Sequence, residues 1–402
     1  MAAVHYHTTA IPSRRFYALL GFLGLWVFLG LYAAHQMETY GHHITGMNNQ
    51  VVWGVPHVFA VFLIIAASGA LNVASVASVF NIDSYRPLSR LSALLAIALL
   101  IGGLAVLVLD LGRPDRLIVA MTHYNFKSIF AWNIFLYTGF AVILVVYLWL
   151  QMEPRLNHLS RYAGLLAFGW RLILTSGTGL IFGLLVARQA YDAAILAPMF
   201  ILMSLSLGTA VFILVMLAIY RFMNMTIVEE TLNRFKKLLG MFVLAVVYIV
   251  TVYHLSNLYV SEHSGIERFI LLDGGTYTLI FWVVQVVMGS LIPLLLIYSS
   301  IFSRLSFSLA LAALLVVIGG IGQLYVLIVG GQAYPLNLFP GMEVSSSFYD
   351  GEIAQYSASI FEILLGVGGV AFALAVVWVG IRVLPLMPNN AHIESPVNGS
   401  RD

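Results

Sequence analysis

Four strongly apolar segments of the sequence carry an ionisable residue near one end. These residues are His57, Asp110, His254 and Glu362. A charge inside a membrane is costly, so an ionisable residue in such a segment is a functional candidate. Histidine titrates near pH 6.5 and burial can raise a carboxyl pKa, so these groups can exchange protons near neutral pH. Quinone chemistry, which moves two electrons and two protons, is one reaction that such a set could serve.

Other polar and aromatic residues lie in the same segments. Trp53 and Trp132 offer flat apolar walls for a ring-shaped headgroup, whose prenyl tail would lie in lipid or between helices. Asn257 follows His254 by three residues, so both lie on one helix face. Arg171 stands inside a further apolar segment.

Each ionisable candidate also has a purely structural explanation. His57 could extend toward water at the membrane interface. Asp110 could form an ion pair with Arg113, three residues later. Glu362 could cap a helix or hydrogen-bond a neighbour, and Arg171 could neutralise a buried carboxylate or bind backbone carbonyls. The sequence leaves both explanations open for each residue.

The composition predicts a polytopic membrane protein. Of the 402 residues 61% are hydrophobic and 9% are charged, with a mean hydropathy of +0.96, whereas soluble domains carry about 25% charge. The net charge of +2 argues against a nucleic-acid partner. There is no cysteine, so the chain cannot supply thiolate ligands for zinc or iron–sulfur clusters. We expect no metal site in it.

Ten apolar runs have the length of about 20 residues that a membrane helix needs. They are 16–36, 52–81, 91–111, 129–150, 163–187, 196–220, 238–260, 276–299, 306–330 and 356–384. The first is longer than the core of a signal peptide, about 7–15 residues, and is predicted as an uncleaved span. We therefore expect an all-α fold with ten transmembrane helices, arranged as two four-helix bundles plus flanking helices.

The charges in the loops predict the orientation. Most of the 19 Lys and Arg lie on the N-terminal side, which places that side and both termini in the cytoplasm. The predicted domains are a cytoplasmic tail (1–15), a membrane domain (16–384) and a second cytoplasmic tail (385–402). The outer side holds the remaining loop cations, Arg113, Arg116, Lys127, Arg188 and Arg268. The four ionisable candidates all lie within about two helical turns of that side, so we expect them to share one headgroup pocket.

Several short motifs follow the predicted spans in order. A Trp-Gly pair, Trp53 and Gly54, opens the second span, and "LDLGRP" (109–114) closes the third. The fourth opens with Asn125, Ser128 and Trp132 in "NFKSIFAW".

The last span has an acid, Glu362, near its start and ends in "RVLPLMP" (382–388). In this order and placement, over nearly all of the chain, the motifs resemble those of the NrfD/polysulfide-reductase family of integral membrane subunits. The resemblance is to the ten-helix branch, and most to its DsrP-type subunits, which belong to a transmembrane complex linked to dissimilatory sulfite reductase.

The resemblance implies a subunit that binds a quinone or quinol, menaquinone or ubiquinone, near the outer face. Such subunits exchange electrons with a ferredoxin-like iron–sulfur subunit in the periplasm and have no haem of their own. The resemblance also implies further partners, such as a cytochrome b and a cytochrome c, and a role in sulfur or sulfite metabolism. The expected location is the bacterial cytoplasmic membrane.

The resemblance further implies two sets of site residues. The catalytic, proton-handling set is His57, Asp110, His254 and Glu362. The quinone-binding set is Trp53, His57, Asp110, Arg113, Asn125, Ser128 and Trp132. The basic loop that follows Asp110 would help to seat the partner. Two positions depart from the family pattern: Ile173-Leu174 replace a His-Gln pair of some relatives, and Asn257 stands where a relative has an acid.

Two other classes of function remain open. A haem b cytochrome could use His57 and His254 as axial ligands on separate helices. A transporter or proton channel would need polar residues through the depth of the membrane and broken helices at its middle. Some residues could line such a path, namely Arg171, Thr175, Tyr248, Gln285 and Gln323.

Overall fold

The computed structural model describes residues 6–8, 11–79, 82–299, 305–336 and 351–388. In this part of the chain, ten helical segments are long and apolar enough to cross a membrane. They are Ser13–Tyr40, Val55–Ser78, Ser84–Leu109, Ile129–Met152, Asn157–Gly183, Leu196–Phe222, Glu229–Tyr259, Thr276–Tyr298, Ser306–Ala333 and Ile360–Val383. The predicted all-helical fold with ten spans is confirmed.

Spans two to five form the first bundle. Span two consists of α2 (Val55–Ala70) and α3 (Asn72–Ser78), and it packs against α4 (Ser89–Leu109). The other two members are α6 (Ile129–Met152) and α7 (Ser160–Gly183), which pack against each other. Contacts of α4 with α6, and of α7 with α2 and α3, close the bundle.

Spans six to nine form the second bundle. Spans six and seven are α8 (Leu196–Phe222) and α9 (Glu229–Tyr259). Span eight contains α11 (Thr276–Leu279), the π-helix η7 (Ile280–Leu291) and α12 (Ile292–Tyr298); span nine contains α13 (Leu305–Tyr325), the π-helix η8 (Val326–Gly330) and α14 (Gly331–Ala333). Because α8 also packs on α2 and α7, it joins the two bundles.

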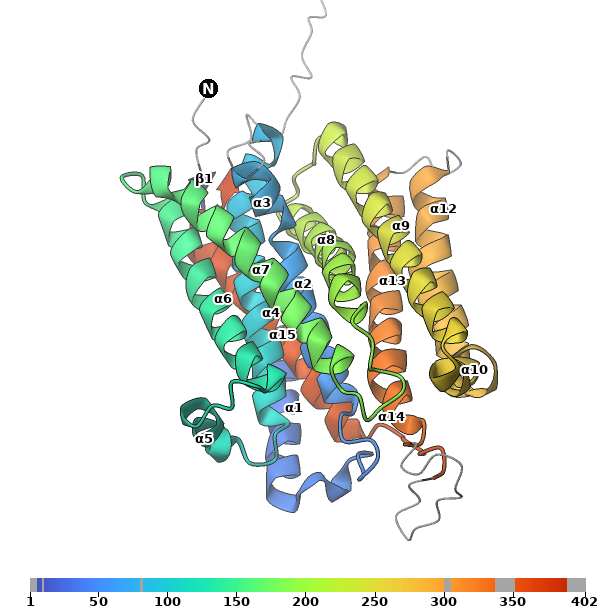
Figure 1. Cartoon of the computed structure of the whole chain (residues 1–402). Coiled ribbons are helices and arrows are strands. Elements are labelled where there is room, and N and C mark those ends of the chain that lie inside the picture. The colour runs from blue at the N-terminus through green and yellow to red at the C-terminus, as the bar shows by residue number, and fades with distance from the viewer. Residues whose placement is uncertain (1–5, 9–10, 80–81, 300–304, 337–350, 389–402) are drawn as a thin grey trace, which may run out of the picture.

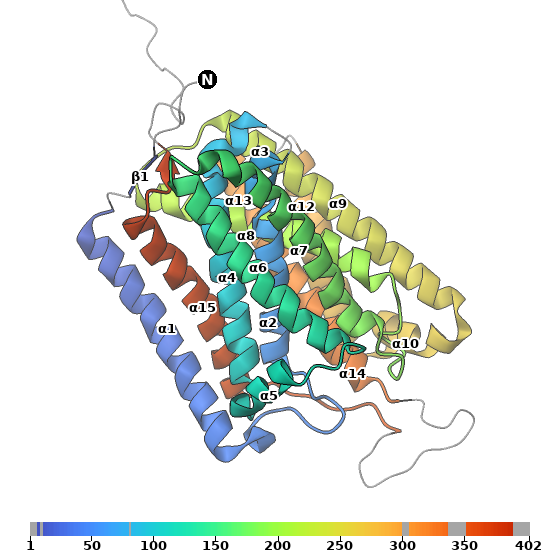
Figure 2. The same ribbon diagram turned by 60° about the vertical axis from the view of Figure 1, so that its left-hand side comes forward.

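The first and last spans flank the first bundle as a pair. They are α1 (Ser13–Tyr40) and α15 (Ile360–Val383), and α15 also packs on α2 and α4 (Figure 2). Beside them, β1 (Tyr6–His7) pairs antiparallel with β2 (Met387–Pro388). The predicted tails, 1–15 and 385–402, lie partly outside the described residues.

Short helices cover both ends of the bundles (Figure 1). One end, here called the outer end, carries the described residues of the connections 41–54, 110–128, 184–195, 260–275, 334–336 and 351–359. Its short helices are η1 (His42–Ile44), η3 (Pro114–Arg116), α5 (Leu117–Thr122), η5 (Ser261–His263), α10 (Ser264–Arg268) and η6 (Phe269–Asp273). The opposite end carries η2 (Asp83–Leu88) and η4 (Asn157–Leu159).

The seventh span differs most from its predicted limits. The prediction begins at residue 238, whereas α9 begins at Glu229. The first turns of α9 are polar, with Glu229 and Glu230 at the positive end of the helix and Arg234 paired to Glu230. A hydropathy threshold excludes such turns although the helix continues through them.

Arg171 lies in the core of the first bundle, with 3% of its surface exposed. Its guanidinium donates hydrogen bonds to the carbonyl of Ser68 and to the side-chain oxygen of Asn72. These residues flank Leu71, where span two changes from α2 to α3. Arg171 therefore binds a backbone carbonyl, which is one of the structural explanations that the sequence left open.

The two bundles touch where α2 and α8 cross at Gly69 and Gly208. A Cβ atom on Gly208 would meet the backbone of Gly69 and Ala70, and one on Gly69 would meet the carbonyl of Ser204. Small residues join membrane helices in this way, because they allow the backbones to touch. The crossing thus fixes how the two bundles sit against each other.

Replacing Gly208 by leucine should strongly destabilise the protein, because the side chain would meet backbone that cannot move aside. Overpacking of this kind costs about 1–3 kcal/mol or more. The matched control is Gly21→Leu, since a Cβ on Gly21 has nothing within 4 Å. Thermal unfolding in detergent should show a lowered Tm for Gly208→Leu and an unchanged Tm for Gly21→Leu. Equal Tm values for the two variants would contradict this packing argument.

Candidate functional site

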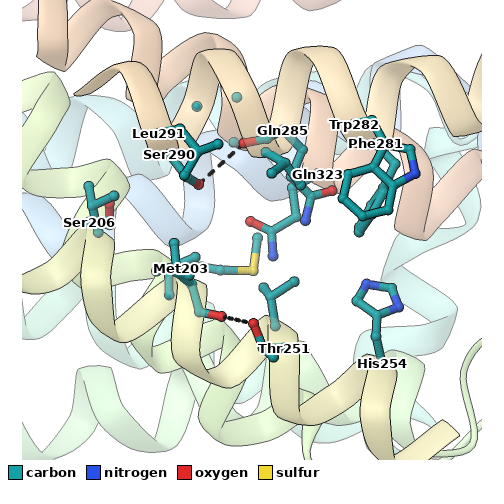
Figure 3. Close-up of a pocket in the computed structure, with 18 of the residues that line it drawn as sticks. Met203, Ser206, Thr251, His254, Phe281, Trp282, Gln285, Ser290, Leu291 and Gln323 are labelled. Atoms are coloured by element: carbon teal, nitrogen blue, oxygen red, sulfur yellow. Dashed lines mark hydrogen bonds between the residues drawn. The ribbon is translucent and has the colours of Figure 1, made fainter. Parts of the chain in front are cut away.

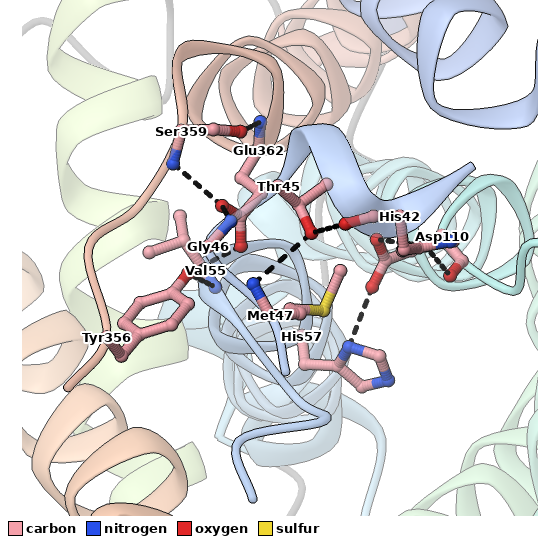
Figure 4. A network of polar contacts seen from close by, with 10 residues as sticks. All are labelled: His42, Thr45, Gly46, Met47, Val55, His57, Asp110, Tyr356, Ser359 and Glu362. Carbon is pink, nitrogen blue, oxygen red and sulfur yellow. Dashed lines mark hydrogen bonds and ion pairs between the residues drawn. The ribbon is translucent and has the colours of Figure 1, made fainter. Parts of the chain in front are cut away.

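Polar side chains from four elements meet at the outer end, between the first bundle and the flanking pair (Figure 4). They are His42 in η1, His57 in α2, Asp110 at the end of α4, and Glu362 in α15. Three of the four ionisable residues predicted from the sequence therefore lie in one network. His254 lies elsewhere, in the second bundle.

The centre of the network is the buried carboxylate of Asp110, whose side chain is 1% exposed. Nδ1 of His57 lies 2.8 Å from its Oδ2, and Nε2 of His42 lies 3.7 Å from its Oδ1. Nε2 of His42 is also 3.1 Å from the backbone carbonyl oxygen of Asp110. Among the described residues, neither carboxylate oxygen has an aligned hydrogen-bond donor. The two imidazoles, at ion-pair distance, are therefore what compensates the charge.

The contacts favour the charged forms of Asp110 and His42. Burial alone would raise the pKa of Asp110, but the contacts with His42 and His57 outweigh it and hold that pKa below its ordinary value. The pKa of His42 is raised, chiefly by its contact with the Asp110 side chain. An opposite charge at short distance has this effect on both partners. Asp110 is therefore a carboxylate at neutral pH.

The motif "LDLGRP" explains how Asp110 reaches this position. Asp110 is the residue at which α4 ends, and its N–H donates to the carbonyl of Val106. Gly112, with φ of 68°, then turns the chain in a left-handed conformation that glycine adopts readily. A Cβ on Gly112 would also lie 3.0 Å from Cε1 of His42. Glycine is thus needed both for the turn and for the approach of His42 to Asp110.

An aromatic wall lies beside His57. The ring of Trp53 is stacked on the His57 imidazole, with centroids 6.0 Å apart and an interplanar angle of 29°. Phe130, Phe182 and Tyr191 surround Trp53 at centroid distances of 6.2, 5.7 and 6.5 Å. Nε2 of His57 points away from Asp110 (Figure 4), and the His57 side chain is 18% exposed. The side of the imidazole that carries Nε2 is therefore not engaged by Asp110.

Trp53 is held by Gln332, which the sequence interpretation did not assign to the site. The backbone N–H groups of Val52 and Trp53 both donate to Oε1 of Gln332 at 3.0 Å, and its Nε2 donates to the carbonyl of Trp53 at 2.9 Å. Arg188 donates to the carbonyl of Gln332 at 2.7 Å. Nothing in the sequence links positions so far apart, although Arg188 was noted as an outer cation.

Glu362 is fully buried and its carboxylate accepts three hydrogen bonds. The donors are the hydroxyl of Tyr356 at 2.6 Å, the N–H of Gly46 at 2.8 Å and the N–H of Ser359 at 2.7 Å. Together with the bond from its own N–H to the Ser359 hydroxyl, this forms a capping box at the start of α15. Glu362 therefore caps the helix and fixes the loop 42–47 that carries His42.

The Glu362 carboxylate explains why glycine stands at position 54, in the Trp-Gly pair. A Cβ on Gly54 would meet the side-chain oxygens of Glu362 and Tyr356. The Tyr356 hydroxyl also accepts the N–H of Val55 at 2.8 Å, at the beginning of α2. Glu362 and Tyr356 thus fix the first turn of the helix that carries His57.

Arg113 does not contact Asp110. Its side chain is 65% exposed, and Nε and Nη2 pair with Oδ1 and Oδ2 of Asp115 at 3.0 and 2.9 Å. The ion pair with Asp110 that the spacing allowed is therefore not formed. The structure places Arg113 on the outer surface, beside the network and outside its polar contacts.

The three residues that open span four lie in the adjoining loop. Oδ1 of Asn125 accepts the N–H of Lys127 at 3.0 Å, and Ser128 is the residue before α6. Trp132 is 48% exposed, and its indole N–H donates to the carbonyl of Phe126 at 2.9 Å. These bonds shape the entry into α6, which brings Phe130 to Trp53. The bonds given for Asn125 and Trp132 stay within this loop and the first turn of α6.

His254 belongs to a second polar cluster at the outer end of α9. Its Nδ1 lies 2.7 Å from Oε2 of Glu267, and Nδ2 of Asn257 donates to Oε1 at 2.8 Å. Glu267, in α10, is fully buried. The sequence interpretation treated Asn257 as a lost acid and missed Glu267, which supplies a carboxylate at this place. The spacing of 13 residues between His254 and Glu267 carries no signal for their contact.

The geometry supports proton exchange with a planar ligand at His57. A carboxylate at Nδ1 orients the imidazole, while Nε2 stays available to a ligand. The aromatic wall supplies apolar contact for a ring. A carbonyl or hydroxyl oxygen on that ring could hydrogen-bond Nε2 and exchange a proton with it.

The chain is similar to known proteins of redox complexes, in two cases over nearly its whole length. It is 28% identical over 395 residues to the Hdr-like menaquinol oxidoreductase integral membrane subunit of Archaeoglobus fulgidus, covering 97% of this chain and 98% of that protein. It is 22% identical over 416 residues to a subunit of the selenate reductase of Mesobacillus selenatarsenatis, covering 93% and 94%. It is 25% identical over 167 residues to the menaquinone reductase integral membrane subunit of Nitratidesulfovibrio vulgaris, covering 41% and 40%.

Residues 43–335 match the family described as polysulphide reductase, NrfD. This stretch contains spans two to nine, and so both bundles, His57, Asp110 and His254. The match extends over more than half of the chain. The chain therefore belongs to the NrfD polysulphide reductase family.

Proposed function

We propose that this chain is the quinol-interacting membrane subunit of an oxidoreductase complex. It would exchange electrons between the quinone pool of the membrane and an iron–sulfur subunit at the outer side. The observation that carries this proposal is the His57–Asp110 pair beside the Trp53 ring. Two of the similar proteins are named for menaquinol or menaquinone, which favours menaquinone over ubiquinone here.

Each residue of the network has a role in this proposal. A bound quinol supplies two electrons and two protons. Nε2 of His57 hydrogen-bonds an oxygen of the ring and accepts one of the two protons, and the Asp110 carboxylate stabilises the resulting imidazolium. The second proton passes to water at the outer end, and the two electrons pass to the iron–sulfur subunit. Trp53 packs on the ring and excludes water from one face. His42 keeps Asp110 ionised between turnovers, because the Asp110 carboxylate raises the pKa of His42 and so favours the charged imidazole.

The residues present fit such a ring. His57 Nδ1 and both carboxylate oxygens of Asp110 are buried polar atoms without an aligned hydrogen bond within the described residues. Phe130, which contacts Trp53, is 45% exposed. We propose that a lipid-soluble ring reaches Trp53 past this side chain.

The roles of the other predicted site residues are narrower. Glu362 acts as a positioning residue, because hydrogen bonds from Tyr356, Gly46 and Ser359 already occupy its carboxylate. Asn125, Ser128 and Trp132 shape the entry beside the aromatic wall. The proposal assigns the proton exchange to His57 and Asp110 and leaves His254 to the second bundle.

The basic loop after Asp110 is the proposed docking surface for the iron–sulfur subunit. Arg116 and Lys127 are exposed there, together with the apolar side chains of Ile118 and Phe126, which are 66% and 64% exposed. Charged residues around an apolar centre are typical of protein interfaces. The chain contains no cysteine, so the iron–sulfur clusters must belong to the partner.

The metabolic role, the further subunits and the type of membrane are also proposals. The DsrP-type motifs support a role in sulfur or sulfite metabolism, with a cytochrome b and a cytochrome c as further subunits. The loop charges support a cytoplasmic membrane with the outer end facing away from the cytoplasm. The named relatives come from both archaea and bacteria, so the predicted bacterial membrane becomes here the cytoplasmic membrane of a prokaryote.

A haem b cytochrome has less support. Two axial histidines must face one another across a haem. His57 and His254 lie in different bundles, and each directs Nδ1 at a carboxylate, Asp110 or Glu267. A visible absorption spectrum of the purified chain without a Soret band would agree with this geometry.

Replacing His57 by asparagine should lower quinol-dependent turnover of the assembled complex by about 100-fold or more, the usual range for loss of a general acid–base group. Asp110→Asn should do the same, because it removes the charge that stabilises the imidazolium. The control is His158→Asn, an exposed histidine at the opposite end. Turnover with a soluble quinol and an artificial acceptor measures the effect. Undiminished turnover in an assembled His57→Asn complex would refute the site.

The His42–Asp110 contact should make stability depend on pH in a defined way. The folded pKa of Asp110 is lowered, so its contribution is present above about pH 4 and is lost as the pH falls through the folded value. The folded pKa of His42 is raised, so its contribution is present below about pH 6.5 and is lost as the pH rises through the folded value.

Thermal unfolding of wild type and Asp110→Asn between about pH 4 and pH 9 tests this dependence. The Tm difference between them should be largest below about pH 6.5 and should shrink as the pH rises. A difference that stays constant over this range would show that His42 does not titrate against Asp110.

Charge reversal in the basic loop should weaken docking of the iron–sulfur subunit. If basic side chains here face acidic groups of the partner, their reversal places like charges opposite each other, which costs several kcal/mol. The double variant Arg116→Glu with Lys127→Glu should therefore reduce recovery of the partner at least about ten-fold. The matched control reverses Arg155 and Arg161, which are exposed at the opposite end. Copurification on a tagged chain at low salt measures the effect. Equal recovery with both double variants would place the docking surface elsewhere.

A further inference from the structure

An apolar cavity of about 290 Å³ lies in the second bundle, away from the His57 network. Side chains of α8, α9, η7 and α13 line it (Figure 3). Ligand sites in proteins commonly measure roughly 300–1,000 Å³. The cavity is therefore large enough for a ring-shaped headgroup, provided that the rest of the ligand lies outside it.

Two buried carboxamides face this cavity. Gln285 in η7 and Gln323 in α13 are each 7% exposed, and both line the cavity. Figure 3 shows their side chains pointing toward each other near its middle. Within the described part of the chain, no hydrogen bond of either side-chain amide is found; the bond from Ser290 goes to the backbone carbonyl of Gln285. Because both side chains line the cavity, their amide groups can donate hydrogen bonds to a ligand with oxygen acceptors.

The helix geometry around the cavity is unusual. Gln285 lies in η7, a π-helix of 12 residues, and such wide turns frequently mark functional sites. Gly289 of η7 and Gly319 of α13 face each other so closely that a Cβ on either would meet the other backbone. This contact holds η7 against α13 beside the cavity, which both glycines line together with Gln285 and Gln323.

The uncharged lining limits which headgroups the cavity can bind. Among the described residues that line the cavity, none is Lys, Arg, Asp or Glu. His254 is the titratable group at its outer margin, and Nδ1 of His254 is already directed at Glu267. A phosphate or carboxylate headgroup would therefore be buried without a counter-charge. Gln285 also lies near the middle of span eight, far from the interface where phospholipid headgroups lie.

The cavity also has an apolar rim toward the bilayer. Lining residues of α9 and η7 are strongly exposed: Leu255 at 61%, Leu258 at 48%, Trp282 at 47% and Leu291 at 48%. In a protein that spans a membrane such side chains face lipid. A long isoprenoid chain could thus leave the cavity between α9 and η7 while its head stays inside.

We propose that this cavity is a second binding site for an isoprenoid quinone. The amide groups of Gln285 and Gln323 donate hydrogen bonds to the carbonyl oxygens of the head, and the isoprenoid chain extends into the bilayer between α9 and η7. The inference rests on the proposed function in one respect, namely that the chain meets the quinone pool. It concerns binding, and the proton exchange stays with His57.

Photoaffinity labelling of the assembled complex with an azido-quinone tests this proposal. After irradiation, mass spectrometry of the peptides should find label in span eight or nine, around Gln285 and Gln323, as well as near His57. Gln285→Leu with Gln323→Leu should reduce the label in the second bundle at least ten-fold and leave the label near His57 unchanged. The control Gln36→Leu, the same substitution in α1, should change neither.

The outcomes separate the two sites. Label near His57 alone, or label in the second bundle that the double variant does not reduce, would overturn the second site and leave the proposed function standing. Label in the second bundle alone would support the second site and count against the His57 site. Unlabelled quinone should compete for the label in the second bundle; competition by phospholipid vesicles without quinone would overturn the assignment of the ligand.

Discussion

A carboxylate inside a membrane protein must be compensated by a positive charge or by hydrogen-bond donors, because neither lipid nor apolar side chains can solvate it. Asp110 meets this requirement with two imidazoles, His57 and His42, each approaching a different oxygen. The rest of the outer end depends on this contact. The buried carboxylate orients the His57 imidazole beside the ring of Trp53.

The surrounding structure fixes that contact through the backbone. Gly112 allows η1 to approach the end of α4, so that His42 can reach Asp110. Glu362 and Tyr356 hold the loop 42–47 and the first turn of α2, and so set the position of His57. Gly112, Glu362 and Tyr356 thus set where the two histidines lie. This role explains why several short motifs with glycine and acidic residues surround a single histidine–carboxylate pair.

The sequence predicted the parts of the structure that depend on local patterns. Ten spans follow from apolar length, and the helix that ends at Asp110 follows from the charged Gly-Pro turn after it. The sequence did not predict contacts between distant segments. Gln332 holds Trp53 and Glu267 contacts His254, and in both pairs the spacing along the chain has no helical period. The sequence also grouped four ionisable residues by depth alone. Depth cannot tell which helices are neighbours, so it could not separate His254, in the second bundle, from His57 and Asp110 in the first.

The central claim is that the polar pair at the outer end of the first bundle receives a quinone ring. A cryo-electron microscopy map of the assembled complex with a saturating menaquinone analogue addresses it most directly. The account predicts density for a flat ring against Trp53, with an oxygen at hydrogen-bond distance from Nε2 of His57. A well-resolved outer end with water or lipid chains at that place, in a complex that turns over the same analogue, would contradict it.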